Sequence, residues 1–262
     1  MNAVIVCTSS PDDLFGDATT ISSGLGCSTS TMSMDLTAAC SGFLFGIVTG
    51  GQFLNNGAAK KALIVGADAL SRWVDWEDRN SCILFGDGAG AAVLTAAESD
   101  DEIGLLGYAA RSNGASHDKL MVPYNGDPNN VPTAPDPTIL SKGKYNCISM
   151  DGKEVYKFAT REVPRVIKEA LDSAEMSVDD VDWLLLHQAN IRIMETVASR
   201  LKIPMEKVIT NLSDYGNTSA ASIPLALDEA VRSGKVKKGD VIATAGFGAG
   251  LSWGSAIIRW GA

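Results

Sequence analysis

Asp35-Leu-Thr-Ala-Ala-Cys40-Ser-Gly-Phe43 is the stretch of this sequence that decides its fold. A run typical of a β-strand stops there at small residues, and a long apolar helix begins at the cysteine. The free N–H groups and the positive dipole end of a helix favour thiolate over thiol, and the thiolate is the nucleophile. Cys40 is therefore a candidate nucleophile, although a single cysteine is more often a small buried core residue.

Two further polar residues stand at the ends of apolar elements. His187 ends the run Asp182-Trp-Leu-Leu-Leu-His187, which predicts a β-strand with an imidazole at its carboxyl tip. Ligands of open α/β sheets bind at that end. Asn217 stands at the start of a predicted helix, where an asparagine is ordinarily an N-cap. The only other histidine, His117, lies at the edge of a loop rich in proline and asparagine and is not expected to act in catalysis.

The two halves of the chain resemble each other, which indicates a diverged duplication. The matching pairs are strand 2–8 with strand 182–187, helix 40–57 with helix 217–233, and strand 61–67 with strand 240–246. We therefore expect Cys40 and Asn217 at equivalent helix starts that face each other across a pseudo-twofold axis. The predicted domains are residues 1–97, with the cysteine, and residues 98–262, with the histidine and the asparagine.

The second half opens with elements that the first half does not show. A predicted strand at 104–110 and a helix at 153–174 are separated by an insertion at 116–145, which predicts a surface loop. Nothing equivalent precedes residue 3. If the halves are duplicates, the first lacks its opening strand and helix, about 70 residues by analogy with the second half.

Composition limits the class of protein and of site. A net charge of −9 argues against nucleic acid as a partner. The five cysteines show no CxxC spacing, which suggests a reducing compartment, and with two histidines we expect no metal site. No stretch approaches a transmembrane helix and no signal or transit peptide is visible, so we expect no membrane partner.

Five motifs, in order along the chain, resemble those of the thiolase superfamily and, within it, of the β-ketoacyl-acyl carrier protein synthase III family. They are Ala38-Ala-Cys40-Ser-Gly-Phe43, Leu84-Phe-Gly-Asp-Gly-Ala-Gly90, His187-Gln-Ala-Asn-Ile-Arg192, Tyr215-Gly-Asn217-Thr-Ser-Ala220 and Phe247-Gly-Ala-Gly-Leu-Ser-Trp-Gly254. Other segments look most like the plant, algal and cyanobacterial branch. The resemblance implies an α/β fold, a thiolase-type αβαβα five-layer sandwich of two duplicated halves with an incomplete N-terminal half.

The resemblance also implies a catalytic triad of Cys40, His187 and Asn217, with an oxyanion hole formed by the backbone N–H groups of Cys40 and Gly248. In this family the cysteine takes the acyl group of acetyl-coenzyme A. Malonyl-acyl carrier protein then loses carbon dioxide, and the enolate, stabilised by the histidine and the asparagine, attacks the acyl-cysteine. The 3-oxoacyl product starts type II fatty acid synthesis, and no cofactor is needed.

Further positions carry family roles in binding. Phe15 matches a residue that reaches across a homodimer interface into the partner's acyl pocket, and Arg79 matches a coenzyme A contact. Residues that match the carrier-protein segment are Gln188, Ala189, Asn190, Ile191 and Arg192. Because the chain is acidic, docking of an acidic carrier protein requires a local basic face. The sequence offers for it Arg192, Arg200, Lys202 and Lys207, which a solvated helix face explains equally well.

Alternatives of other classes remain open. A papain-like peptidase also orders Cys, His and Asn in this way, but its local cysteine signature is absent. A non-catalytic homologue or a fragment would bind acyl carrier protein without turnover, and another thiolase-superfamily condensing enzyme would share the triad. For a condensing enzyme of fatty acid synthesis we expect the cytoplasm of a bacterium or the plastid stroma of a plant or alga.

Overall fold

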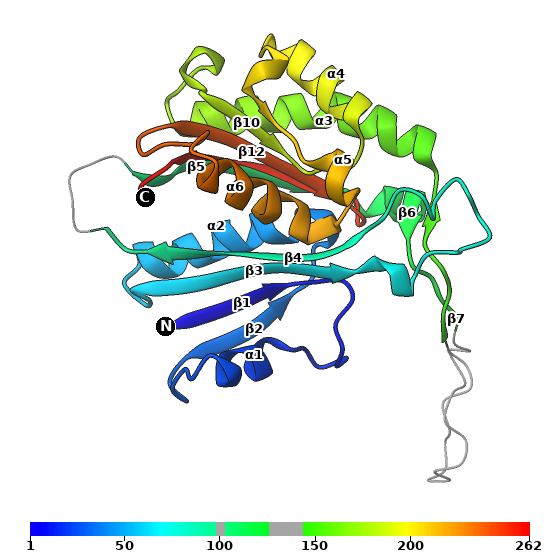
Figure 1. The fold of residues 1–262 in the computed structure, drawn as a ribbon, viewed down its shortest axis with the longest axis horizontal. Helices are drawn as coiled ribbons and strands as arrows, with labels where there is room; N and C mark the ends of the chain where they lie inside the picture. The colour runs from blue at the N-terminus through cyan, green and yellow to red at the C-terminus, as the bar shows by residue number, and fades with distance from the viewer. Residues whose placement is uncertain (98–102, 126–143) are drawn as a thin grey trace.

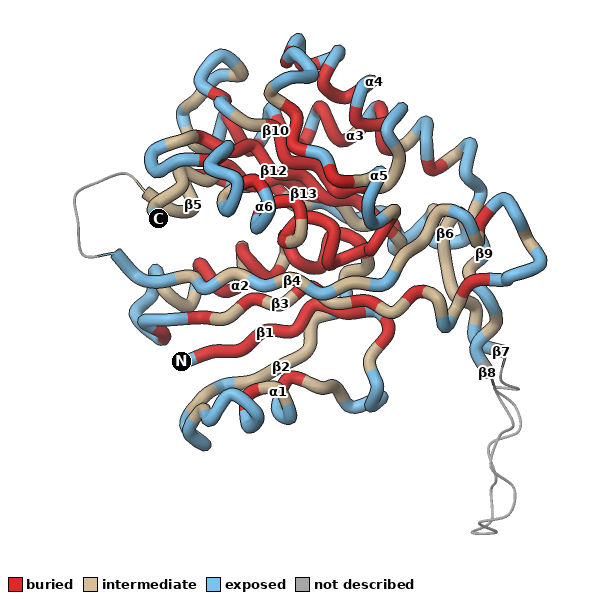
Figure 2. Tube along the Cα trace, viewed as in Figure 1, coloured by how far each residue is buried: buried red, intermediate tan, exposed pale blue. Residues whose placement is uncertain are grey.

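Two β-sheets alternate with three layers of helices, so that the molecule is stacked in the order α-β-α-β-α (Figure 1). The structure is a computed structural model and describes residues 1–97, 103–125 and 144–262. The five-layer architecture predicted from the sequence is confirmed. A single layer of helices between the two sheets is buried from both sides, as the colouring of Figure 2 shows.

The first sheet has the strand order β2-β1-β3-β4. Its strands are β1 (Ala3–Cys7), β2 (Met32–Leu36), β3 (Lys61–Ala69) and β4 (Asp87–Thr95). Strand β1 is parallel to both neighbours, and β4 runs antiparallel to β3. All residues of β1 are buried, as a run of apolar residues in a central parallel strand requires. Helix α1 (Ala18–Gly24) covers the outer face of this sheet.

The second sheet has the strand order β11-β10-β12-β13-β5. Its strands are β5 (Gly104–Ser112), β10 (Trp183–Leu186), β11 (Val208–Ile209), β12 (Val241–Gly248) and β13 (Ser252–Arg259). Its outer face is covered by α3 (Gly152–Ser173) and α4 (Ile191–Leu201), and the largest apolar cluster of the molecule lies beneath them. Both helices are capped, since Asp151 accepts the N–H of Glu154 and Asn190 accepts that of Arg192.

The inner layer consists of α2 (Gly42–Asn55) and α6 (Ser222–Arg232). A short 3₁₀ turn leads into each helix, Ala39–Ser41 before α2 and Ser219–Ala221 before α6. Helix α2 packs closely on β1 and β3 because it presents glycines to them: a Cβ at Gly46 would lie 2.6 Å from Cys7 Sγ. These two helices carry their amino ends, and the residues just before them, to one end of the sheets.

The remaining described segments form short elements. They are the 3₁₀ turns Leu70–Arg72, Gly114–Lys119, Val178–Asp180 and Met205–Lys207, the helix α5 (Leu212–Tyr215), and the strands β6 (Leu120–Met121), β7 (Tyr124–Asn125), β8 (Lys144–Tyr145) and β9 (Ser149–Met150). Strand β6 pairs with β9, and β7 pairs with β8. The insertion predicted as a surface loop therefore contributes ordered ladders at its two ends, while residues 126–143 lie outside the described residues.

The sheets differ at one edge. In the second sheet β13 pairs with β5, whereas among the described residues β4, the counterpart of β13, pairs only with β3. The described part of the first half likewise shows no counterpart of α3. This is the difference that the comparison of the two halves predicted. None of the described helices is both long and apolar enough to cross a membrane.

Candidate active site

Cys40 lies in the turn that leads into α2. The preceding residue, Ala39, has φ 47°, a left-handed conformation that few residues with a side chain adopt, and it turns the chain sharply from β2 into the helix. Cys40 is 7% exposed. Gly248, at the end of β12, lies directly behind it, because a Cβ at Gly248 would be 2.7 Å from Cys40 N. Only a glycine leaves the space beside this N–H open.

The same turn occurs before α6, where Ser219 has φ 52°. Ser219 is thus the counterpart of Ala39, and Ala220 the counterpart of Cys40. Ala3 and Cys40 are 37 residues apart, as are Trp183 and Ala220. The prediction that Asn217 is equivalent to Cys40 was therefore wrong by three residues.

Asn217 is held just ahead of this turn and is not a helix cap. It forms a one-residue parallel bridge with Phe85, in which Asn217 N donates to Leu84 O and Gly86 N donates to Asn217 O, both at 2.9 Å. Its side-chain Oδ1 accepts the N–H of Ser219 at 2.9 Å. That bond orients the amide, since the oxygen is committed to Ser219 and the NH₂ group points the other way.

Ser219 links the cysteine to the asparagine. Its hydroxyl donates to Cys40 Sγ at 3.3 Å, while its backbone N–H donates to Asn217. The structure therefore brings Cys40 and Asn217 together around one serine. The sequence analysis gave Ser219 no role, although its position in the Asn217-Thr-Ser-Ala motif was a usable signal.

His187 is fixed at the tip of β10 by the neighbouring strand β12. Its backbone N–H donates to Ala245 O at 2.8 Å, and its ring meets Phe247 edge-on at a centroid distance of 5.3 Å. Nδ1 is 2.7 Å from Ser222 Oγ at the start of α6. The side chain is 1% exposed, and burial lowers the pKa of the imidazole to about 3, so the ring is neutral near pH 7.

Burial also dominates the ionisation of Cys40. It raises the pKa of this thiol to about 12, against the lowering effect of the Ser219 hydroxyl and with a smaller raising effect of the Asp68 carboxylate. The thiolate expected from the helix start is therefore not the resting form. Desolvation outweighs the helix dipole here, and the thiol must lose its proton as it attacks.

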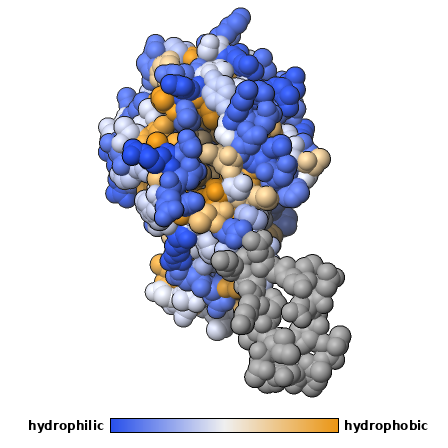
Figure 3. All heavy atoms as spheres, turned by 90° about the vertical axis from the view of Figure 1, so that its right-hand side faces the viewer, coloured by the Kyte–Doolittle hydropathy of each residue, from blue (hydrophilic) through white to orange (hydrophobic). Residues whose placement is uncertain are grey.

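A cavity of about 630 Å³ opens onto Cys40 and Ser219. Its wall is largely apolar and includes Leu36, Phe45, Leu70, Phe85, Leu120, Met121, Val122 and Ile148. Seen from the end of the sheets where this site lies, apolar surface gathers in the middle of the molecule between hydrophilic flanks (Figure 3). Three of the wall residues, 120–122, come from the insertion that the sequence analysis placed on the surface. His187, Asn217 and Gly248 are buried and are not among the residues that line the cavity.

The residues expected to bind substrate lie elsewhere in this chain. Phe15 is 96% exposed in the loop after β1, and Arg79 is exposed in a turn. Neither lines the cavity at Cys40. A phenylalanine so exposed makes almost no packing contact within its own chain. His117 is also exposed and lies outside the cavity.

The segment expected to bind carrier protein divides into a buried and an exposed part. Gln188 is 0% exposed, donates to Leu186 O at 2.6 Å and accepts the N–H of Asn211 at 3.2 Å. The prediction that Gln188 binds carrier protein was therefore wrong, because its amide forms hydrogen bonds inside the protein and does not reach a docked partner. Ala189 and Asn190 are half-buried, and Ile191 and Arg192 are exposed at the start of α4.

The residues around the site include no metal-binding group among those described and one buried aspartate, Asp68, that the sequence analysis did not foresee. Within the described ranges, no three or more His, Cys, Asp or Glu side chains are grouped to hold a metal ion. Asp68, buried in β3, accepts hydrogen bonds from Ser9 N at 2.8 Å, Ser10 Oγ at 2.9 Å and Ala220 N at 3.2 Å. A lone aspartate inside an apolar strand was the sequence signal for this contact.

Comparison with known proteins agrees with this geometry. The family model described as 3-oxoacyl-[acyl-carrier-protein] synthase III matches residues 34–114, and the model of its C-terminal part matches residues 171–260. The β-ketoacyl-[acyl-carrier-protein] synthase III of Trichormus variabilis is 55% identical over 262 residues, 100% of this chain and 77% of that protein. The corresponding protein of Nostoc sp. is 56% identical over 261 residues, with the same coverage.

Solved structures give the same result. The crystal structure of 3-oxoacyl-(acyl carrier protein) synthase III from Pseudomonas aeruginosa superposes with a TM-score of 0.88 at 37% identity, covering 100% of this chain and 77% of that one. The synthase III structure from Aquifex aeolicus gives a TM-score of 0.87 at 38% identity, covering 99% and 77%.

Proposed function

This chain belongs to the 3-oxoacyl-[acyl-carrier-protein] synthase III family of condensing enzymes that initiate fatty acid synthesis, and we propose that it condenses acetyl-coenzyme A with malonyl-acyl carrier protein. The observation that carries the proposal is that Cys40 lies in the wall of an apolar cavity and accepts a hydrogen bond from Ser219, which also donates a hydrogen bond to Asn217. Family membership removes the papain-like peptidase from the alternatives.

In the first half-reaction the sulfur of Cys40 attacks the acetyl thioester. The carbon–sulfur bond to coenzyme A breaks, and the thiol proton of Cys40 ends on the coenzyme A sulfur, so that no outside acid or base is consumed. The developing oxyanion is placed between the N–H groups of Cys40 and Gly248, where the absence of a side chain at Gly248 leaves room for it.

In the second half-reaction malonyl-acyl carrier protein loses carbon dioxide and becomes a thioester enolate. The Asn217 NH₂ group and the His187 Nε2–H stabilise the enolate oxygen as neutral donors, which suits an imidazole that stays uncharged. The enolate carbon attacks the acetyl-cysteine and expels the Cys40 sulfur, which takes up one proton. The product is a 3-oxoacyl-acyl carrier protein.

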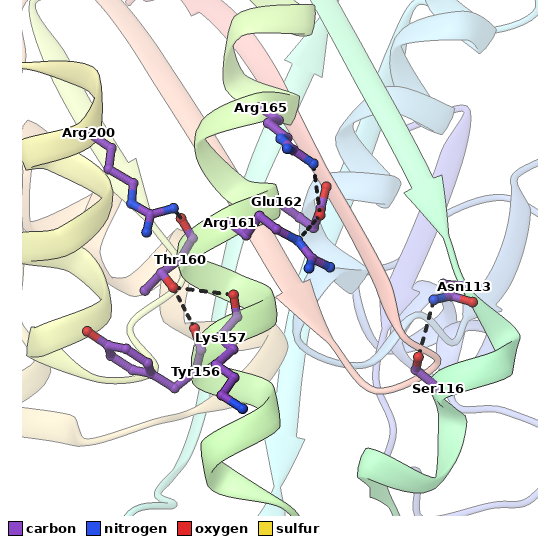
Figure 4. Close-up of polar contacts among 9 residues, drawn as sticks. All are labelled: Asn113, Ser116, Tyr156, Lys157, Thr160, Arg161, Glu162, Arg165 and Arg200. Carbon is purple, nitrogen blue, oxygen red and sulfur yellow. Dashed lines mark hydrogen bonds and ion pairs between the residues drawn. The ribbon is translucent and has the colours of Figure 1, made fainter.

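The carrier protein is proposed to dock on α3 and the start of α4. Four cations spaced one turn apart, Lys153, Lys157, Arg161 and Arg165, are exposed along α3. Glu154 pairs with Lys157 at 2.7 Å. Glu162 pairs with Arg161 and Arg165 at 2.5 and 3.3 Å, as Figure 4 shows. These cations outnumber the two carboxylates, so this ridge, which we call the α3 ridge, keeps a positive surface for an acidic partner.

Two contacts align α4 with the α3 ridge. Tyr156 lies 3.1 Å from Thr196 through their hydroxyls, and Arg200 donates to Thr160 O at 2.8 Å, so residues 40 apart lie level on the two helices. Arg192 is therefore level with the beginning of α3. That beginning is only four residues past Ile148, which lines the cavity, so an arm from a carrier protein docked here has a short path to Cys40.

Two of the four cations nominated from the sequence are less available. Arg200 is tied to Thr160 O, and Lys207 donates to Val181 O at 2.7 Å. Arg192 and Lys202 are exposed. The proposed docking surface is accordingly the α3 ridge, which the sequence analysis did not single out, together with Arg192, which it did.

The test has two steps with the same protein sample. Mass spectrometry after mixing with acetyl-coenzyme A is expected to show one acetyl group on Cys40, and adding malonyl-acyl carrier protein is expected to release carbon dioxide and 3-oxoacyl product. Binding of carrier protein without acetylation or product would instead establish the non-catalytic alternative. Product from a different acyl donor alone would identify another condensing enzyme of the superfamily.

We extend the proposal to a homodimer, supported by the exposure of Phe15 and Leu14 in one loop. In the dimer Phe15 is assigned to the partner's acyl pocket and Arg79 to coenzyme A, in the cytoplasm of a bacterium or the stroma of a plastid. Light scattering of the parent and of Phe15→Ser tests the dimer, and a monomeric parent would remove the role given to Phe15.

A further inference from the structure

Ser222, the first residue of α6, contacts the imidazole of His187 from inside the protein. Its hydroxyl oxygen is 2.7 Å from His187 Nδ1 and accepts the backbone N–H of Gln188 at 3.3 Å. Ser222 is 1% exposed, so water does not replace a missing partner. The hydroxyl makes no further hydrogen bond within the described ranges 1–97, 103–125 and 144–262.

The single hydroxyl hydrogen decides how this group is arranged. A hydroxyl donates one hydrogen bond and accepts two, and one acceptor site is filled by Gln188 N–H. If Nδ1 carried the ring proton, both neighbours would donate to the oxygen and the hydroxyl hydrogen would be left buried without an acceptor. If Nδ1 carries no proton, the Ser222 hydroxyl donates to it and accepts from Gln188 N–H. The hydroxyl, Nδ1 and this N–H then each have a hydrogen-bond partner.

We propose that Ser222 is a positioning residue that donates to His187 Nδ1 and thereby keeps the single ring proton on Nε2. The consequence rests on the proposed function, since a donor at Nε2 is what the malonyl enolate requires. Because burial holds this imidazole neutral, one ring nitrogen is always bare, and the wrong tautomer would present a lone pair to the enolate oxygen.

The other half of the molecule supports the pairing of serine with histidine. Cys7, at the end of β1, is the counterpart of His187, and Gly42, at the start of α2, is the counterpart of Ser222; each pair is 180 residues apart. A Cβ at Gly42 would lie 3.1 Å from Cys7 Cβ. In the half that has Cys7 in place of the histidine, the counterpart of Ser222 is a glycine and carries no side chain.

Nitrogen-15 NMR of the imidazoles reads the tautomer directly. These 262 residues contain only two histidines, so ¹⁵N-histidine labelling of this chain, purified without a histidine tag, gives two ring systems, and His117→Gln identifies the signals of His117. The parent is expected to show His187 as the neutral Nε2–H form. In Ser222→Ala the proton is expected to populate Nδ1, whereas Ser222→Thr, which keeps the hydroxyl, is expected to retain the parent form.

Single-turnover kinetics then connects the tautomer to the reaction. Ser222→Ala is expected to lower carbon dioxide release from malonyl-acyl carrier protein by about tenfold to a hundredfold, below the loss from removing an oxyanion donor outright, and to change acetyl transfer to Cys40 by less than about threefold. Ser222→Thr is expected to restore most of the rate. Ser255→Ala is the matched control, since Ser255 is buried, its hydroxyl has no partner among the described residues, and it lies on β13, which β12 separates from the strand that carries His187.

An unchanged Nε2–H form in Ser222→Ala would overturn the proposal, as would an Nδ1–H form in the parent. A tautomer change without loss of condensation would show that Ser222 does not serve the reaction and would overturn it as well. Should the parent lack condensing activity altogether, the proposed function fails, but the spectra still judge whether Ser222 sets the tautomer.

Discussion

The two halves of this molecule build the same turn and use it differently. In each half a residue with positive φ leads into an inner helix, Ala39 before α2 and Ser219 before α6. The final residues of β3 and β12 lie next to these turns. At equivalent positions, β3 carries Asp68 and β12 carries Gly248. The difference between an aspartate and a glycine decides at which turn a side chain of the protein accepts the backbone N–H.

Asp68 fills the space beside the turn of the second half. Its Oδ2 accepts the N–H of Ala220, while Oδ1 is held by the groups around Ser9 and Ser10. Gly248 has no side chain to place at the equivalent N–H, which belongs to Cys40. At one turn the backbone N–H is thus bound by a fixed carboxylate of the protein itself, and at the other the N–H is offered to the oxyanion of a reacting thioester.

Removing the nucleophile gives the largest expected effect. Cys40→Ala is expected to abolish acetyl-enzyme formation, because none of the other four cysteines, all of them within the described residues, lines the cavity. Cys7→Ala is the control: Cys7 is also buried, with a pKa raised to about 12 by burial, but it lies at the position of His187. Intact-protein mass spectra after acetyl-coenzyme A check both variants, and normal acetylation of Cys40→Ala would remove the assignment.

Removing the amide of Asn217 is expected to separate the two half-reactions. Asn217→Ala should lower carbon dioxide release by about a hundredfold to a thousandfold and leave most acetyl transfer intact, because the enolate loses one of its donors. Asn217→Asp keeps an oxygen for Ser219 N–H but lacks the NH₂ group, so it distinguishes donation from positioning. Carbon dioxide release at the parent rate in either variant contradicts the role in the enolate step.

Adding a methyl group beside the turn before α2 tests the comparison itself. In Gly248→Ala the new Cβ would lie 2.7 Å from Cys40 N, so the turn must move. A misplacement of about 1 Å at reacting groups can cost about a hundredfold in rate, so acetyl transfer is expected to fall by up to that factor. Gly24→Ala, where a Cβ meets nothing within 4 Å, is the control. Equal acetylation rates for the parent and Gly248→Ala would mean that the space at Gly248 is not used.

The sequence predicted the elements of this site better than their register. Cys40 stands out because a long apolar helix begins there, and His187 because it ends an apolar strand. Asn217 was aligned with Cys40 because an asparagine before a helix resembles a cap, yet tertiary pairing with Phe85 places it ahead of the turn. Positive φ at Ala39 and Ser219 is a property of the folded chain that neither residue type announces.

Burial explains the other departures from the sequence analysis. A helix start favours a thiolate in water, but the sequence does not reveal that the layers around Cys40 exclude water and raise its pKa. Gln188 looked like part of a docking segment because it adjoins Arg192, whereas its amide is used to tie β10 to β11. Both outcomes depend on contacts between segments distant in sequence.

The depressed pKa of His187 predicts how stability changes in acid. The folded imidazole has a pKa of about 3 and the unfolded one about 6.5, so between these values only the unfolded chain binds the proton. The free energy of unfolding therefore falls as pH is lowered below 6.5. From pH 6.5 to pH 5 the parent should lose about 2 kcal/mol more than His187→Gln, as urea unfolding would measure. Parallel curves for the two proteins would show that His187 is not buried as described.

Charge reversal on the α3 ridge is expected to give the smallest effect. In Lys157→Glu with Arg161→Glu, KM for malonyl-acyl carrier protein should rise about threefold to tenfold at low salt, because exposed charges contribute modestly to encounter with an acidic partner. Acetyl transfer from acetyl-coenzyme A should stay at the parent rate, since neither residue lines the cavity.

The control for this variant is Lys238→Glu, an exposed lysine just before β12, whose opposite end carries Gly248 beside Cys40. Added salt should shrink the difference between the ridge variant and the parent, because screening weakens interactions between exposed charges. If Lys238→Glu raises KM as much as the ridge variant does, net charge alone governs the encounter. The carrier protein would then have no preferred site on α3. The functional difference between the two halves would then lie only in the turns before α2 and α6.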